Sequence, residues 1–451
     1  MTTPRPDDVD DLRDRAVATL QALVRIRTVS HADPAQRDEA PFVAFADELR
    51  RRLPLLHQHL ELTTLPGHAL LFRWRGRSSD RPVVLMAHVD VVPVAEDAPW
   101  QHPAWDATVV DGHVWGRGTL DDKGPLVCVV EAVERLLARG FVPAQDVWLS
   151  FGTTEEVSGE TAGLAVDELE RRGVEPWFVV DEGGAVAHDA FPGIAPPLGV
   201  VGVTEKGTTT LELRVDGRGG HASTPSRMDA VARLARAVVR LDRSPLPASV
   251  PAPTIELFRR IAPHAPPPLR PLLANAARLR PVVARALVAA GPETAAMART
   301  TVAVTTLSGS PAHNVLASTA RAGVNVRVML GDTVAGVVEH LRRAIGDDQV
   351  QVSVVDPGEA SPLSPVDDDA FRLLERTIGA QFPEAVVTPY VMMAATDSRF
   401  FTRICPRVYR WSPLRMTKAQ RQSIHSYDEH VGVDDLADGV LWYERLIEAL
   451  T

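Results

Sequence analysis

Acidic residues and single histidines recur where short apolar runs of this sequence end, and their side chains can carry chemistry. The set comprises His88 and Asp90 in RPVVLMAHVD, Asp121 and Asp122 in GRGTLDDKG, Glu155 and Glu156 in DVWLSFGTTEE, Asp181 and Glu182 in PWFVVDEGG, and His425, Glu429 and His430 in SIHSYDEH. Zinc accepts imidazole nitrogen and carboxylate oxygen as ligands, and several carboxylates make a ligand set anionic enough for two divalent ions. The residue types therefore predict a dinuclear metal centre that assists hydrolysis.

Each motif by itself has an ordinary structural explanation. His88-x-Asp90 is typical of a hydrogen-bonded core histidine, Glu155–Glu156 of a solvated turn, and Asp121–Asp122 of a helix cap. Charged groups seldom lie beside buried strands unless they are paired or bound to a metal. The recurrence of such motifs at successive strand ends therefore favours a metal site over the separate structural explanations.

Two local arrangements suggest how such a centre is organised. Asp90 lies two residues beyond His88 on the same strand face, so it can accept the second imidazole N–H and fix the tautomer. In the adjacent pair Glu155–Glu156, one carboxylate can bind metal while the other acts as a base on the attacking water.

The elements that must position these residues alternate along the first part of the chain. Residues 81–90, 146–152 and 177–180 are expected to be buried strands. Residues 10–26, 124–140 and 165–172 are expected to be helices, the second with Pro125 in its first turn and Gly140 at its end. This alternation predicts an α/β fold with a doubly wound, largely parallel sheet, in which ligands bind at the carboxyl ends of the strands.

The pattern changes near residue 200. Residues 208–215 and 322–330 alternate apolar and polar side chains, which is typical of half-exposed antiparallel strands. Residues 244–299 are rich in Pro, Ala and Arg and are expected to form a helical insertion. We expect a catalytic domain formed by residues 1–203 and 361–451, interrupted by an α+β domain over residues 204–360.

Composition limits the partners. The chain has 451 residues and a net charge of −10, which argues against nucleic acid or an anionic membrane as the main partner. The arginines of the insertion are not interleaved with aromatic residues, so solvated helix faces explain them better than an RNA contact. Cys128 and Cys405 are expected to be buried apolar residues. The start MTTPRPDDVDD does not resemble a secretion signal, and the expected location is the cytoplasm.

The combined motifs resemble metallopeptidase family twenty, which includes aminoacylase, bacterial-type glutamate carboxypeptidase and succinyl-diaminopimelate desuccinylase. The resemblance runs from about residue 20 to the end of the chain, and VSGE, VDEGG, ATDSRFF and IHSYDEH look most like the Gly-X carboxypeptidase and N-acyl-amino-acid hydrolase branch. It implies a zinc-peptidase-like catalytic domain with a mixed sheet and an inserted α+β lid and dimerisation domain.

The resemblance also implies a role for each residue of the centre. His88 and Glu182 would bind one zinc, Glu156 and His425 the other, and Asp121 both. Asp181 is the alternative to Glu182. Glu155 would be the general base and Asp90 would orient His88, and the peptide after Asp121 is expected to be cis. Cobalt or manganese can replace zinc on such ligands.

In the second domain, the resemblance places His221 of the motif GGHAS in the active site of the partner in a homodimer. Asn314, Arg327 and Thr396 would contact the substrate, with an ordinary surface position as the alternative for Arg327. The family usually has glycines before Thr396, whereas this chain has Met392, Met393, Ala394 and Ala395 there. The methionines can line an apolar pocket or simply pack.

The function that these features predict is hydrolysis of an amide bond next to a free carboxylate, in an N-acyl amino acid or a small peptide. The alternatives are a dipeptidase, a carbamoyl-amide hydrolase, or a non-catalytic protein that binds amino-acid conjugates on the same scaffold. The presence of Glu155 with a full ligand set argues against the binding protein.

Overall fold

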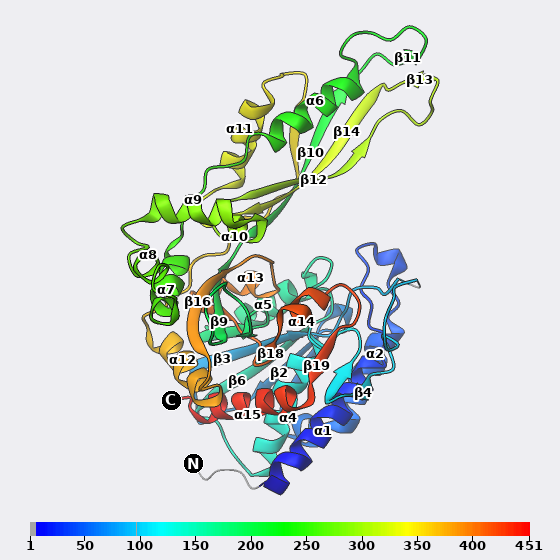
Figure 1. The fold of residues 1–451 in the computed structure, drawn as a ribbon. Helices are drawn as coiled ribbons and strands as arrows, with labels where there is room; N and C mark the ends of the chain where they lie inside the picture. Colours follow the sequence, from blue (N-terminus) through cyan, green and yellow to red (C-terminus); the bar gives the residue numbers. More distant parts are fainter. Residues whose placement is uncertain (1–5, 96) are drawn as a thin grey trace.

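The fold consists of a large α/β body and a second, elongated body that extends from it (Figure 1). A computed structural model describes residues 6–95 and 97–451. The large body contains a ten-stranded sheet, and the second body contains a separate four-stranded sheet. The α/β fold expected from the sequence is confirmed.

The large sheet is mixed, with a parallel centre and antiparallel neighbours. Its strands, in order, are β1 (Glu61–Thr64), β2 (Leu70–Trp74), β6 (Gln145–Gly152), β3 (Ser78–His88), β7 (Phe178–Asp181), β17 (Val408–Arg410), β9 (Leu198–Glu205), β8 (Ala185–Ala187) and β18 (Arg415–Met416), and β16 (Val386–Met392) pairs with β9. Strands β6, β3, β7 and β17 run parallel to their neighbours within this group, whereas β1–β2, β2–β6, β17–β9 and β8–β9 are antiparallel.

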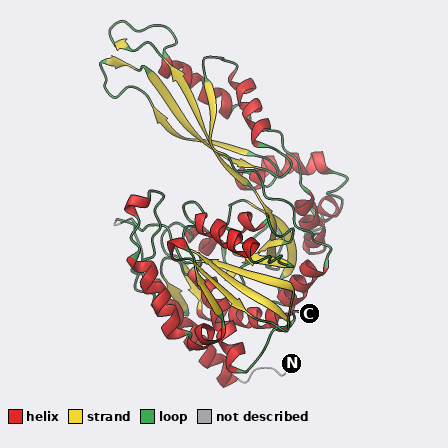
Figure 2. Ribbon diagram, turned by 180° about the vertical axis from the view of Figure 1, so that it is seen from behind, coloured by secondary structure: helices red, strands yellow, loops and turns green. Residues whose placement is uncertain are grey.

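Alternate side chains of the central strands supply two hydrophobic cores, one on each face of the sheet. On β3, Val83 and Leu85 belong to one core, and Val84 and Met86 to the other. The first core is closed by α1 (Pro6–Val24), α2 (Ala40–Arg52), α3 (Pro54–His59), α4 (Lys123–Ala138), α12 (Asp369–Gln381) and α15 (Val433–Glu448), and the second by α5 (Glu160–Arg171) and α13 (Ser398–Phe401). Figure 2 shows these helices around the large sheet. Burial on both faces explains why these strands are apolar runs in the sequence.

Helix α4 begins at the site that the sequence marks and ends as predicted. Pro125 lies in its first turn, where a missing N–H costs no hydrogen bond. Gly140 follows its end with φ 68°, a backbone conformation that glycine adopts without steric cost. The loop directly before this helix contains Asp121 and Asp122, so the first turn of α4 lies next to these two candidate residues.

The second body is an antiparallel sheet covered by two helices. Its strands, in order, are β12 (Thr301–Ser308), β14 (Thr319–Val328), β10 (Gly207–Asp216) and β15 (Gln351–Asp356), and its helices are α6 (Ala230–Asp242) and α11 (Val334–Ile345). Strand β10 alternates buried and partly exposed residues, as its sequence predicts. A short pair, β11 (Gly220–His221) and β13 (Val315–Leu316), lies at the end of this body remote from the large sheet (Figure 1).

The insertion is helical and has a third hydrophobic core. Its helices are α7 (Ala252–Ile261), α8 (Arg270–Ala274), α9 (Arg280–Ala290) and α10 (Pro292–Ala296). Phe258 and Ile261 of α7 share this core with Leu198 of β9, and Val386 and Tyr390 of β16 pack against it. The insertion is therefore fastened to the large sheet, although its sequence lies between strands of the second body.

The remaining elements are short. They are β4 (Thr108–Val110), β5 (His113–Trp115) and β19 (His430–Gly432) in a three-stranded sheet, α14 (Lys418–Ser423), and the 3-10 turns Pro34–Gln36, Pro66–His68 and Ala262–His264. Within residues 6–95 and 97–451, none of the helices has the length and apolar character that crossing a membrane requires.

The packing of the insertion predicts a stability difference between two substitutions. Phe258→Ala removes a fully buried ring from the third core, and we expect it to lower the free energy of unfolding by about 3–5 kcal/mol. Val282→Ala, in the same insertion but 50% exposed, should change it by less than about 0.5 kcal/mol. Thermal melting of both variants checks this, and equal melting temperatures would contradict the assignment of Phe258 to a core shared with the sheet.

Candidate metal centre

The central strands deliver the candidate ligands to one edge of the large sheet. Strand β3 ends at His88, which is in register with Gly152 at the end of its parallel neighbour β6. The chain reaches Glu155 and Glu156 a few residues later, and β7, the neighbour on the other side, is followed directly by Glu182. Because parallel strands end at the same edge, these side chains meet there.

Two clusters of possible metal ligands result, and they share one residue. The first cluster is His88, Asp121 and Glu182, and the second is Asp121, Glu156 and His425. Within each cluster the donor atoms lie within 4.8 Å of one another. The structure thus brings together all five residues predicted as ligands, which come from five separate segments of the chain.

Asp121 presents one carboxylate oxygen to each cluster. Its Oδ1 lies 2.9 Å from Nε2 of His88, and its Oδ2 lies 3.0 Å from Nε2 of His425. His88 Nε2 is also 3.5 Å from Glu182, and His425 Nε2 is 2.9 Å from Glu156. The Asp121–Asp122 peptide is cis, as the resemblance implied. Because each oxygen of Asp121 lies near a different histidine, this carboxylate is suited to being shared by two metal ions.

The electrostatics of the site fit a pair of divalent cations. Burial, together with the negative charge of Asp121, raises the pKa of Glu182 to about 8. Hydrogen bonds that the His425 imidazole donates to Asp121 and Glu156 raise the pKa of His425 to about 10. Oε1 of Glu156 is buried without a hydrogen-bond partner. The site therefore offers carboxylate oxygens and imidazole nitrogens close together, which are the ligand atoms that a dinuclear metal centre needs.

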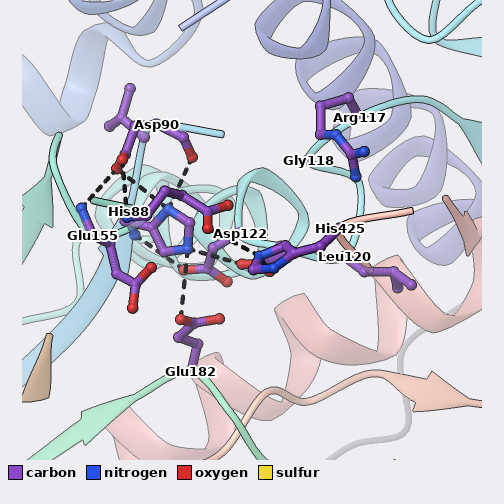
Figure 3. Close-up of polar contacts among 12 residues, drawn as sticks. His88, Asp90, Arg117, Gly118, Leu120, Asp122, Glu155, Glu182 and His425 are labelled. Atoms are coloured by element: carbon purple, nitrogen blue, oxygen red, sulfur yellow. Dashed lines mark hydrogen bonds and ion pairs between the residues drawn. The ribbon is translucent and has the colours of Figure 1, made fainter. Parts of the chain in front are cut away.

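Asp90 positions both His88 and the two glutamates, partly in a different way from the one predicted. Nδ1 of His88 is 2.9 Å from the backbone oxygen of Asp90 and 3.5 Å from its carboxylate. That carboxylate accepts the backbone N–H groups of Glu155, at 3.2 Å, and of Glu156, at 3.1 Å. The backbone carbonyl is therefore the nearer partner of the imidazole, and the side chain orders the loop that follows β6 (Figure 3).

The geometry separates Glu182 from its neighbour Asp181. Glu182 faces His88 (Figure 3), whereas Oδ2 of Asp181 accepts the backbone N–H of Ser398 at 2.8 Å. Asp181 belongs to neither ligand cluster. The structure therefore places Glu182, and not Asp181, among the candidate ligands.

Glu155 lies beside the clusters without belonging to either. In Figure 3 its carboxylate points toward the same space as that of Glu182. Burial raises the pKa of Glu155 well above its ordinary value, and the negative charge of Glu182 adds to the shift. A carboxylate that lies beside the ligand clusters without belonging to either is free to accept and return a proton.

The four other predicted site residues belong to neither cluster of candidate ligands. His221 is on β11, and Asn314 directly precedes its partner strand β13. The backbone oxygen of Asn314 accepts the N–H of Ala222 at 3.1 Å. Nη1 of Arg327, on β14, donates to the hydroxyl of Thr208 at 2.6 Å. Thr396 is fully buried, and its hydroxyl donates to Glu205 at 3.1 Å. Strands β11 and β13 lie at the end of the second body remote from the large sheet (Figure 1), so one chain by itself does not bring His221 to the candidate metal ligands.

Two residues that the structure places at the centre had no role assigned to them from the sequence. Asp122 is fully buried, and its Oδ2 accepts the backbone N–H of His88 at 3.1 Å. Gly184 is two residues after the candidate ligand Glu182. A Cβ there would lie 2.2 Å from the backbone oxygen of Val200, so only glycine fits at this position. The only features of the sequence that point to these two residues are the repeated aspartate in GRGTLDDKG and the repeated glycine in VDEGG. Met392 is buried against Gly183, beside Glu182.

An α/β sheet whose parallel strands end in two nitrogen and oxygen ligand clusters with a common carboxylate defines a metal-dependent hydrolase with a dinuclear centre. The family model for peptidase family M20/M25/M40 matches residues 84–449. The chain belongs to this family and is a metallohydrolase.

Relatives match along almost the whole chain. It is 32% identical over 458 residues to the probable carboxypeptidase S-like 2 of Dictyostelium discoideum, covering 98% of this chain and 87% of that protein. It is 35% identical over 446 residues to the human N-fatty-acyl-amino acid synthase/hydrolase PM20D1, covering 97% and 88%.

Solved structures of the same fold are more distant in sequence. The M20 family metallo-carboxypeptidase Sso-CP2 from Sulfolobus solfataricus matches with a TM-score of 0.68 and 17% identity over 96% of this chain and 98% of that one. The YXEP protein of Bacillus subtilis, described as a dinuclear metal-binding peptidase of the M20 family, has a TM-score of 0.60 and 14% identity over 97% and 98%.

The shared carboxylate predicts different metal losses for two ligand substitutions. Asp121→Ala should reduce the binding of both ions, because Asp121 belongs to both clusters, whereas His425→Ala should weaken mainly one. Elemental analysis after dialysis against a fixed free zinc concentration distinguishes the two variants. If Asp121→Ala lost one ion and kept the other at wild-type affinity, the bridging position would be wrong.

Proposed function

We propose that this protein is a two-zinc hydrolase of amide bonds next to a free carboxylate, acting on N-acyl amino acids or small peptides. The observation that carries the proposal is that Asp121 is common to two ligand clusters while Glu155 stands beside them without belonging to either. The names of the relatives support the substrate class, since one is a probable carboxypeptidase and another an N-fatty-acyl-amino acid synthase/hydrolase.

The residues fall into separate roles in this reaction. His88 and Glu182 would hold one zinc, Glu156 and His425 would hold the other, and Asp121 would be shared by both. When bound, a pair of zinc ions lowers the pKa of water and polarises a carbonyl oxygen. Glu155 takes the proton of the attacking water as the new C–O bond forms. It returns a proton to the amine nitrogen as the C–N bond breaks, so the carboxylate is regenerated.

We further propose that residues 204–360 act as a lid and dimerisation domain. In this proposal the partner's His221 stabilises the negative oxygen that develops during attack, and Asn314, Arg327 and Thr396 contribute to substrate binding. The guanidinium of Arg327 suits a free carboxylate, because its planar donors match the two oxygens. The location of β11 far from the metal ligands of its own chain supports a site completed by a second copy (Figure 1).

The reaction class is tested by metal content and hydrolysis together. Wild-type protein should contain about two zinc ions per chain and cleave an N-acyl amino acid, with activity lost on chelation and restored by zinc. Glu155→Ala should keep both ions and the wild-type melting temperature while turnover falls by about 10²–10⁴-fold, because the proton acceptor is gone. A dipeptide assayed in parallel reports substrate scope. An active, zinc-loaded Glu155→Ala protein would exclude Glu155 as the base.

The contribution of a second copy is tested by mixing two inactive variants. Glu155→Ala and His221→Ala chains are purified separately, and we expect each to be nearly inactive. After dissociation and reassembly in equal amounts, about a quarter of the sites should combine an intact Glu155 with the partner's intact His221, and activity should return accordingly. Reassembly into mixed dimers without recovery of activity would contradict the role of the partner's His221.

A further inference from the structure

Glu429 is a fully buried acid, 0% exposed, whose carboxylate is surrounded by donors from a single loop. Its Oε1 accepts the backbone N–H groups of Leu120 at 2.7 Å and of Asp121 at 3.1 Å. Its Oε2 accepts the backbone N–H of Gly118 at 3.0 Å and Nη1 of Arg117 at 2.7 Å. All four donors belong to residues 117–121, the segment that ends in the shared metal ligand.

Arg117 extends the contact to the second ligand loop. It is 3% exposed, and its Nη2 donates to the backbone oxygen of Ser426, the residue after His425. The backbone N–H of Gly116 donates to the backbone oxygen of Glu429 at 2.9 Å. The segment carrying Asp121 and the segment carrying His425 are therefore joined by both side-chain and backbone hydrogen bonds. Figure 3 shows Arg117, Gly118 and Leu120 next to His425.

The hydrogen bonds of Glu429 leave it no role as a ligand. Each of its two oxygens already accepts two donors, and Glu429 belongs to neither cluster of possible ligands. A buried carboxylate is costly unless donors surround it, so this arrangement is stable only while the loop keeps its shape. His425 itself has φ 60°, a left-handed conformation that a non-glycine residue adopts only when its surroundings hold it.

We propose that Glu429, together with Arg117, is a positioning residue that holds Asp121 and His425 in ligating geometry before any metal binds. The proposal rests on the two-metal centre described under the proposed function. Metal ligands must be held within about 0.5 Å of the productive geometry, and the backbone amide of Asp121 is one of the four groups that Glu429 fixes. Groups that orient ligands from outside the centre typically change metal affinity by about 10–100-fold when they are replaced.

The variant Glu429→Gln keeps the size of the side chain but replaces one acceptor oxygen by an NH₂ group, which faces N–H donors and cannot accept from them. Glu134→Gln is the matched control. Glu134 is a 3% exposed acid that accepts the backbone N–H groups of Leu55, at 3.0 Å, and Leu56, at 2.7 Å, and it lies on α4 away from the ligand clusters. Both variants lose a comparable buried acceptor, but only one touches the ligand loops.

The experiment compares wild type, Glu429→Gln and Glu134→Gln in two measurements. Titration of the metal-free proteins with zinc should show at least one site weakened about 10–100-fold in Glu429→Gln and unchanged in Glu134→Gln. Hydrogen exchange of the metal-free proteins should show faster exchange of residues 117–121 in Glu429→Gln alone. Saturating zinc should restore much of kcat with little change in KM. Glu429→Asp, which keeps the charge but shortens the reach, should have an intermediate zinc affinity and replaces Glu429→Gln if that variant does not fold.

The outcomes separate the two proposals. Wild-type zinc affinity and exchange in Glu429→Gln, or equal losses in Glu134→Gln, would overturn the positioning role while leaving the metal centre intact. Wild-type protein that binds no zinc and hydrolyses no amide would instead refute the proposed function.

Discussion

The structure depends on keeping several carboxylates close together at one edge of a buried sheet. Asp121, Glu155, Glu156 and Glu182 converge there, and burial together with mutual repulsion raises the pKa of Glu182 to about 8. Such a concentration of like charge is stable only when cations neutralise it or donors surround it. Two divalent ions would satisfy the first condition for the candidate ligands. Backbone N–H donors satisfy the second for Asp90 and Glu429, which are buried carboxylates outside the ligand clusters.

Those outer carboxylates explain how loops rather than rigid strands can hold metal ligands. Asp90 accepts the N–H groups of Glu155 and Glu156, and Glu429 accepts those of Leu120 and Asp121. In each case a buried acid fixes the backbone of the segment that carries a ligand. The strands set the positions to within a residue, because β3, β6 and β7 are parallel and end together, and the buried acids set the remaining geometry.

The second body has a core of its own, separate from the sheet that carries the candidate metal ligands. Its own core packs β10 and β14 against α6 and α11, and the short pair β11–β13 projects from its far end (Figure 1). The insertion packs on β9 and β16 through Leu198 and Tyr390, so it supports the region from which this body extends. The distance of His221 from its own metal ligands makes a second copy the natural source of that side chain in the proposed reaction.

The sequence by itself determined the α/β class, the three central strands to within a few residues of their ends, and the candidate ligands that follow them, because apolar runs and the acids after them are local features. Only the tertiary structure decided that the insertion packs on the large sheet, that the backbone of Asp90 is the nearer partner of His88, and that the carboxylate of Glu429 joins the loops of two ligands. These are contacts between residues far apart in the chain, or between a side chain and a neighbouring backbone. They depend on register and on loop geometry, which spacing in a single sequence does not encode.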